Sequence, residues 1–244
     1  MNARRNFLRS TLAGGLAIIA GGTLLSASSC GKENSEEGEG EEEDEEVTAN
    51  EDLMREHGVL RRALLVYFLS TKKLRSGQGE IPPDALNKTA RLFRSFGEDY
   101  HERALEEPFI FPAVKRAGGQ GAEYVDVLLA QHQRGREVTD FILATTGGPK
   151  LGGPATEQLA LALDTFVLMY NEHTAREDTI VFPAWHKALS KHDYHEMGEK
   201  FEDIEHKQFG KDGFDDAVKQ IAEIEQSLGF ADLAQFTAPA PPKA

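Results

Sequence analysis

Hydrophobic residues recur at intervals of three and four positions along most of the chain beyond residue 50. That spacing predicts helices, and no segment shows the convincing alternation of apolar and polar positions that predicts a half-buried strand. Four long helices are predicted, over about 51–74, 84–115, 122–144 and 156–189. Two shorter helices are predicted after them, over about 193–206 and 214–228.

Glycine and proline separate the predicted helices. The breaks are Ser76-Gly77-Gln78-Gly79, Pro82-Pro83, Ala117-Gly118-Gly119 and Gly147-Gly148-Pro149. Because short connections join antiparallel helices, the pattern predicts an all-α fold, an up-down-up-down four-helix bundle over residues 50–190. Residues 191–230 are predicted to be two additional C-terminal helices packed on the outside of the bundle, and residues 231–244 an irregular tail.

The apolar stripe of the fourth long helix ends in two residues that a core does not normally bury. His173 and Glu177 continue the spacing of the apolar residues before them, which are Leu159, Leu163, Phe166 and Tyr170. An imidazole and a carboxylate one turn apart are therefore predicted to face the core. Burying an ionised carboxylate without a partner costs several kcal/mol, and a bound cation removes that cost.

Three other histidines repeat this placement. The stripe of the first helix contains His57, together with Leu53, Leu60, Leu64 and Phe68. The stripe of the third helix contains His132, together with Val125, Leu128, Gly135, Thr139 and Ile142. The second helix carries His101 and Glu106 just before Phe111-Pro112, as the fourth carries its pair just before Phe182-Pro183.

One histidine on an apolar face is usually a hydrogen-bonded core residue. Four histidines at the same height of a bundle, joined by two carboxylates, instead predict a metal site. Imidazole and carboxylate ligands suit iron, manganese or zinc, and the absence of thiols beside them disfavours copper(I) and iron–sulfur clusters.

The second helix leaves its ligand open to two interpretations. His101 and Glu106 are five residues apart, which turns an ideal helix through about 500° and displaces the carboxylate by roughly 140° from the histidine. A single π-bulge would bring both onto one face, and we favour His101 for that reason. In the competing interpretation Glu102, one turn before Glu106, is the ligand and His101 points elsewhere.

Other residues near the predicted site receive simpler interpretations. The small Gly135 and Thr139 are expected to leave room beside a metal, and Arg136 is expected to be a solvated charge rather than a partner of the site. Tyr170 is expected to pack in the core, with donation to a bound ligand as an alternative. The remaining histidines, His186, His192, His195 and His206, are expected on the surface.

The N-terminal residues 1–30 are predicted to be an export signal. Arg4-Arg5 precedes an apolar stretch of about 14 residues, short of the roughly 20 that span a membrane, and the pattern resembles a twin-arginine signal. Cys30, the single cysteine, follows in a lipoprotein-like context, although Ala27 stands where such sites usually carry leucine. We expect lipidation of Cys30 and an extracytoplasmic, membrane-anchored protein, with cleavage by an ordinary signal peptidase as the alternative.

Residues 31–49 are predicted to be an acidic, disordered linker. Residues 33–46 alone hold ten acids and no base, so the other 31 acids and 27 bases leave a balance of −4. Without a basic stripe the remaining chain is not expected to bind nucleic acid. A plain spacer is the expected role of such a segment.

The histidines and glutamates, with Phe-Pro after the second and fourth pairs, resemble the hemerythrin-like (HHE cation-binding) domain over roughly residues 50–190. The resemblance implies two irons per chain, bridged by Glu106, Glu177 and an oxo or hydroxo group. The terminal ligands it implies are His57, His101, His132 and His173. It also implies dioxygen or another small diatomic molecule as the ligand.

The chain departs from the oxygen carriers of that family at Arg136, where those proteins place a further histidine. This departure favours a reactive or sensing centre over a carrier. We expect a protein that binds metal and oxygen for carriage, storage or sensing, and favour such a binding protein over an enzyme. A di-iron oxidoreductase acting on nitric oxide or peroxide, or an iron-storage or metal-binding module, is the alternative. A ferritin-like site is disfavoured, since Glu98-x-x-His101 is a single match where two are needed.

Overall fold

The computed structural model describes residues 47–76 and 80–242 of this chain. The predicted export signal with Cys30, and most of the predicted acidic linker, lie outside the described residues. Within the described ranges no helix is both long enough and apolar enough to span a membrane. The described residues from Thr48 onward make up one compact unit.

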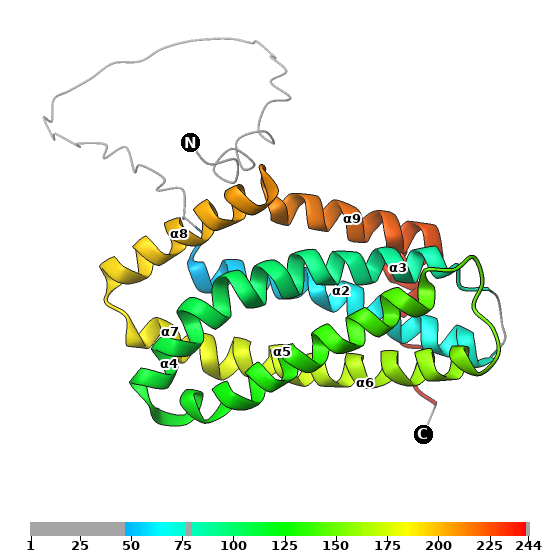
Figure 1. The fold of residues 1–244 in the computed structure, drawn as a ribbon, viewed down its shortest axis with the longest axis horizontal. Helices are drawn as coiled ribbons and strands as arrows, with labels where there is room; N and C mark the ends of the chain where they lie inside the picture. The colour runs from blue at the N-terminus through cyan, green and yellow to red at the C-terminus, as the bar shows by residue number, and fades with distance from the viewer. Residues whose placement is uncertain (1–46, 77–79, 243–244) are drawn as a thin grey trace, which may run out of the picture. The chain divides into compact units, whose positions relative to one another are not determined.

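Four helical rods form the bundle (Figure 1). The first rod is α2 (Ala49–Ser76), and the third is α5 (Gly119–Thr146). The second rod consists of α3 (Pro83–Leu92), the π-helix η2 (Phe93–Ile110) and α4 (Phe111–Ala117). The fourth consists of α6 (Pro154–Arg176), the π-helix η3 (Glu177–Val181) and α7 (Phe182–Ala188). The predicted all-α, up-down-up-down arrangement is confirmed.

Each rod contacts the rods on either side of it, and α4 of the second rod also contacts α7 of the fourth, so that α2, η2, α5 and α6 surround a common interior. Aromatic side chains fill this interior on one side of the histidine level. Phe93 and Phe166 lie edge to face with ring centroids 4.9 Å apart, and each also contacts the ring of Tyr170. This packing fixes the separation of the helices that carry the histidines.

One residue of the predicted stripe on the first helix does not face the interior. Phe68 is 41% exposed, whereas Leu53, Leu60 and Leu64 are buried. Summed over the steps from Leu53, the 3.6-residue period of a helix displaces Phe68 by about 60° around the axis. The displacement carries its ring to the surface, where the Lys72 ammonium lies over it.

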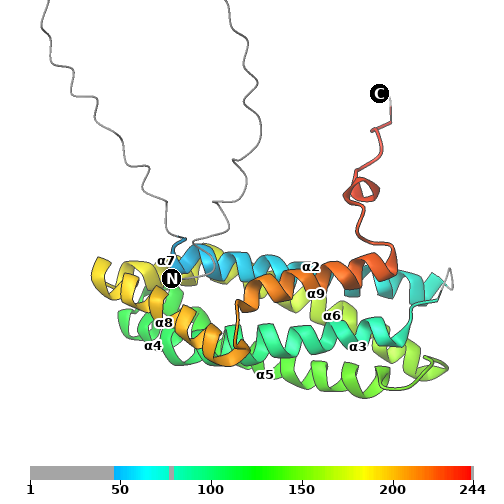
Figure 2. The ribbon, with the colours of Figure 1, turned by 90° about the horizontal axis from the view of Figure 1, so that it is seen from above.

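The two additional helices, α8 (Lys191–Phe209) and α9 (Gly213–Leu228), run along one side of the bundle against α2 and the second rod (Figures 1 and 2). Phe201 of α8 stacks on Trp185 of α7, and Glu225 of α9 pairs with Arg62 of α2. After them, Leu233–Phe236 forms a 3-10 turn (η4), and residues 237–242 have no regular structure. The predicted placement of both helices is confirmed.

Candidate metal centre

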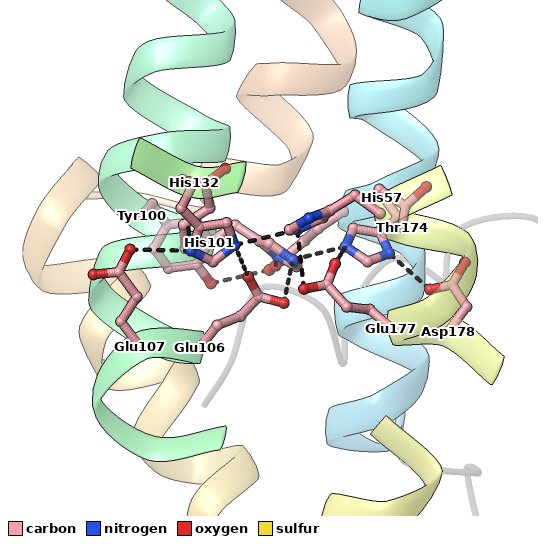
Figure 3. Close-up of polar contacts among 12 residues, drawn as sticks. His57, Tyr100, His101, Glu106, Glu107, His132, Thr174, Glu177 and Asp178 are labelled. Atoms are coloured by element: carbon pink, nitrogen blue, oxygen red, sulfur yellow. Dashed lines mark hydrogen bonds and ion pairs between the residues drawn. The ribbon is translucent and has the colours of Figure 1, made fainter. Parts of the chain in front are cut away.

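Five of the six residues predicted as ligands lie at one level of the bundle interior (Figure 3), namely His57, His101, Glu106, His132 and Glu177. The sixth, His173, is also buried, and its Nε2 lies beside that of His132. His57 comes from α2, His101 and Glu106 from η2, and His132 from α5. His173 lies in the last turn of α6, and Glu177 begins η3. All six side chains are buried. The structure therefore brings together every residue of the predicted set.

The four histidines meet as two pairs. In the first pair the Nε2 atoms of His57 and His101 are 2.9 Å apart. In the second pair the Nε2 atoms of His132 and His173 are 3.2 Å apart. Each pair therefore directs two nitrogen atoms at one point in the interior.

The two carboxylates lie between the pairs, with one oxygen toward each. Glu106 places Oε1 3.4 Å from His101 Nε2 and Oε2 3.3 Å from His132 Nε2. Glu177 places Oε2 3.5 Å from His57 Nε2 and Oε1 3.0 Å from His173 Nε2. Each carboxylate thus has one oxygen beside each histidine pair, so that two nitrogen and two oxygen donors gather at each pair.

These carboxylate oxygens also lack the hydrogen bonds that buried polar atoms normally make. All four, on Glu106 and Glu177, are buried without a hydrogen-bond partner among the described residues. Buried polar atoms are normally hydrogen-bonded, and leaving one unsatisfied costs about 1–3 kcal/mol. Bound cations would satisfy all four, so the donor set fits metal.

Two π-helical segments position the carboxylates. The N–H of Phe111 donates to the carbonyl of Glu106, and the N–H of Phe182 donates to the carbonyl of Glu177, both across five residues. The i→i+5 bonding brings His101 and Glu106 onto one face, in agreement with the preferred interpretation of this helix. The π-helix η2 extends over 18 residues, however, so the expectation of a single bulge was wrong in extent.

A closed ring of hydrogen bonds orients the four imidazoles. Each histidine donates through Nδ1 to an acceptor on the neighbouring rod, which leaves each Nε2 free to face the site. The bonds are His101 to Glu56 (2.6 Å), His132 to Glu107 (3.0 Å), His173 to Gln131 (2.9 Å) and His57 to Asp178 (2.7 Å). Such partners fix the tautomer and orientation of ligating histidines.

Our sequence interpretation missed these four acceptors. Each lies directly beside a predicted ligand in the chain: Glu56 precedes His57, Glu107 follows Glu106, Gln131 precedes His132 and Asp178 follows Glu177. Adjacent residues of a helix point about 100° apart, so the neighbour of an inward ligand faces the next helix. That adjacency is the signal that could have identified them.

Two phenylalanines cover the pairs. The Phe182 ring stacks on His57 with centroids 5.3 Å apart, and the Phe111 ring stacks on His132 at the same distance. Each phenylalanine directly follows a π-helical segment, and its backbone N–H makes the last hydrogen bond of that segment. The Phe-Pro sequences therefore end the π-turns and also shield the centre with apolar surface.

Two expectations on the third helix were wrong. Arg136 is buried rather than solvated, and its Nη1 donates to Glu102 at 3.0 Å and to Glu107 at 2.9 Å. The space beside Gly135 is filled by Tyr170, because a Cβ at Gly135 would lie 1.9 Å from its hydroxyl oxygen. Tyr170 itself donates to Glu102 at 2.8 Å. Both oxygens of Glu102 therefore accept hydrogen bonds from these side chains, which favours His101 rather than Glu102 as the ligand on the second rod.

Burial and mutual charge set the protonation of the metal-free centre. Burial, and then the Glu106 charge, hold the pKa of Glu177 well above its usual range. Burial lowers the pKa of His132, but the Glu102 charge, the nearby Glu106 carboxylate and the hydrogen bond to Glu107 outweigh it and raise that pKa to about 10. Protons therefore occupy part of the centre when no cation does, and binding a metal has to displace them.

Glu98 is a further buried carboxyl group, one turn from His101. It accepts a hydrogen bond from the Thr139 hydroxyl at 2.5 Å and pairs with Arg94 at 2.7 Å. Burial nevertheless outweighs these partners and raises the pKa of Glu98 to about 7.

The four histidines outside the centre, His186, His192, His195 and His206, are exposed as expected.

The buried histidine pairs, with carboxylates between them inside a helical bundle, place the chain in the class of metal-binding helical-bundle proteins. Residues 48–185 match the family model described as the hemerythrin HHE cation binding domain, and the chain belongs to this family. Uncharacterized proteins of Mycobacterium tuberculosis and Mycobacterium bovis are each 43% identical to the chain over 220 residues. Those alignments cover 88% of this chain and 85% of each relative. No solved structure matched the chain.

Proposed function

We propose that this protein is a non-haem di-iron protein that binds dioxygen or another small diatomic molecule. The observation that carries the proposal is the placement of Glu106 and Glu177, each with one oxygen toward each histidine pair. One cation at each pair would have two imidazole nitrogens and two carboxylate oxygens as donors. Such mixed donors suit iron, and membership of a cation-binding family supports the same assignment.

The metal ions, when bound, would supply redox chemistry and coordination positions that the four protein donors leave open. The chain itself supplies orientation and exclusion of water. The Nδ1 bonds hold each imidazole in the tautomer that ligates through Nε2. Phe111 and Phe182 cover the imidazoles with apolar rings, so a small uncharged molecule suits the interior better than a large or charged substrate.

The test is reconstitution of the full chain with Fe²⁺ under anaerobic conditions, followed by optical spectroscopy with and without dioxygen. The proposal predicts two irons per chain and an absorption band that appears with dioxygen. A band that vanishes when dioxygen is removed would indicate reversible binding, and one that decays with consumption of dioxygen would indicate an oxidase. A protein that retains a single zinc and shows no band would refute the proposal.

We also propose that the chain is exported and anchored through Cys30, on the strength of the Arg4-Arg5 signal pattern. In a bacterial host with a twin-arginine pathway, the full chain should fractionate with membranes. An Arg4→Lys, Arg5→Lys double variant should remain in the cytoplasm, and Cys30→Ala should appear in the soluble exported fraction. Export of the double variant at the wild-type level would contradict the signal assignment.

A further inference from the structure

The centre is built from two halves that correspond residue by residue. In the first half α2 carries His57 and η2 carries His101 and Glu106. In the second half α5 carries His132, and α6 with η3 carries His173 and Glu177. The correspondence extends outward, to Phe111 and Phe182, to Glu107 and Asp178, and to Arg136 and Arg61, which pair with Glu107 and Asp178 respectively.

The correspondence breaks at one orienting acceptor. Glu56 precedes His57 and accepts from His101 Nδ1 at 2.6 Å, whereas Gln131 precedes His132 and accepts from His173 Nδ1 at 2.9 Å. Glu56 is buried and also accepts from the Tyr100 hydroxyl at 3.0 Å. One half therefore has an anionic acceptor where the other half has a neutral amide.

The charge of that acceptor changes the donor strength of the imidazole. A carboxylate on Nδ1–H raises the basicity of Nε2, and a neutral amide does so less, since the hydrogen bond to an anion is stronger. His57, His101 and His132 all have carboxylate acceptors, and His173 alone of the four has an amide. His173 is therefore the weakest donor of the set.

The surrounding charges do not restore the missing carboxylate. Glu102 is a further carboxylate beside the second histidine pair, but its oxygens accept from Arg136 and Tyr170, and it lies 3.9 Å from His132 Nδ1. Arg136 also takes part of the charge of Glu107, because its Nη1 and His132 Nδ1 donate to the same oxygen atom. In the first half, Asp178 instead accepts from His57 and from Arg61 through different oxygens.

We infer that the two metal positions are unequal in affinity. The position at His57 and His101 fills first, and the position at His132 and His173 fills second and loses its metal first, with Gln131 as the positioning residue that sets the difference. This inference rests on the proposed two-metal site. A change in an outer hydrogen-bond partner of this kind typically alters metal affinity by about 10- to 100-fold.

The experiment is an anaerobic titration of the metal-free full chain with Fe²⁺, in which calorimetry measures the heat of each addition. Iron enriched in the Mössbauer isotope, added as the first or as the second equivalent, reports each position separately. We expect two resolved steps and a distinct Mössbauer signal for each. Two equal steps with one shared signal would overturn the inference and leave the two-iron proposal intact, whereas binding of one equivalent or none would refute that proposal itself.

Three variants assign the steps. Gln131→Glu should tighten the second step by about 10- to 100-fold and leave the first unchanged, and Glu56→Gln should weaken the first by a similar factor. Gln133→Glu is the matched control, since Gln133 lies on the same helix but is exposed and bonds only to Glu137 among the described side chains. Tightening of the first step by Gln131→Glu, or an equal effect of the control, would overturn the inference. If Gln131→Glu does not fold, Glu56→Gln alone serves as the test, and weakening of the second step by that variant would overturn the inference.

Discussion

The Nε2 atoms of His57 and His101 lie 2.9 Å apart in a fully enclosed site. Both rings donate through Nδ1 to carboxylates, so in their neutral forms both Nε2 atoms present lone pairs to one another. Two lone pairs at that separation repel unless a cation or a proton lies between them. Burial lowers the pKa of His101, but the charges of Glu106 and Glu56 outweigh it and hold that pKa well above its usual range. A proton therefore takes the place of the metal in the metal-free protein.

Glu177 should lower the folding stability of the metal-free protein. Its oxygens are buried without partners in the metal-free protein, so Glu177→Leu should raise the free energy of unfolding of that form by about 1–3 kcal/mol. With Fe²⁺ present the order should reverse, because the variant lacks one of the two carboxylates proposed to hold the cations. Thermal unfolding with a chelator and with Fe²⁺ measures both. A variant less stable than wild type with the chelator would contradict this account of the carboxylate.

Asp178 should affect metal affinity without touching the metal. It accepts from His57 Nδ1 at 2.7 Å, so Asp178→Ala should weaken Fe²⁺ binding by about 10- to 100-fold. Asp126→Ala is a suitable control, because Asp126 is exposed and pairs with Lys115 at the surface. Equal affinities of the two variants, measured by competition with a chelating dye, would show that the hydrogen bond does not orient the imidazole.

Arg136 should be a structural cation. It lies between Glu102 and Glu107, so Arg136→Met leaves a buried carboxylate unpaired and should cost about 3–5 kcal/mol in urea unfolding. Arg134→Met, two residues away and exposed, should leave the stability unchanged. Adding Glu102→Gln to Arg136→Met should recover part of the loss. If the double variant is no more stable than the single one, the pairing is not the source of the effect.

Glu98 should make folding stability depend on pH. Because its pKa is about 7 in the folded chain and near 4.5 when unfolded, the folded state retains the proton over that interval. Stability relative to Glu98→Gln is therefore highest below about pH 4.5 and falls as pH rises to 7, by about 3 kcal/mol at 1.36 kcal/mol for each unit of pKa. Urea unfolding of both metal-free proteins at pH 5 and about pH 8 measures the difference. A constant difference would contradict the assignment.

The sequence predicted the inward histidines and glutamates because helical periodicity alone fixes which residues share a face. His173 and Glu177, one turn apart, needed no information from other helices. Their partners required the bundle geometry, since Gln131 reaches His173 only because α5 lies beside α6. Adjacency in the chain could have named these acceptors as candidates, but not which histidine each one holds.

Arg136 and the π-helix show where periodicity is insufficient. Arg136 follows His132 by one turn and so shares its inward face, but whether a charged residue there is solvated depends on Glu102 and Glu107 across the interface. The extent of η2 depends on a shift in backbone bonding that starts well before Glu106. A spacing of five residues indicates that such a shift is needed, without giving its length.

X-ray absorption at the iron edge of the chain loaded with two equivalents of Fe²⁺ tests the central claim most directly. The account predicts two imidazoles per iron and a second iron at roughly 3.5–4 Å, the separation typical of two-metal sites. Loss of the iron–iron signal in Glu106→Ala, with one iron retained, would agree with it. Iron without a neighbouring iron in the wild type would contradict the two-metal centre.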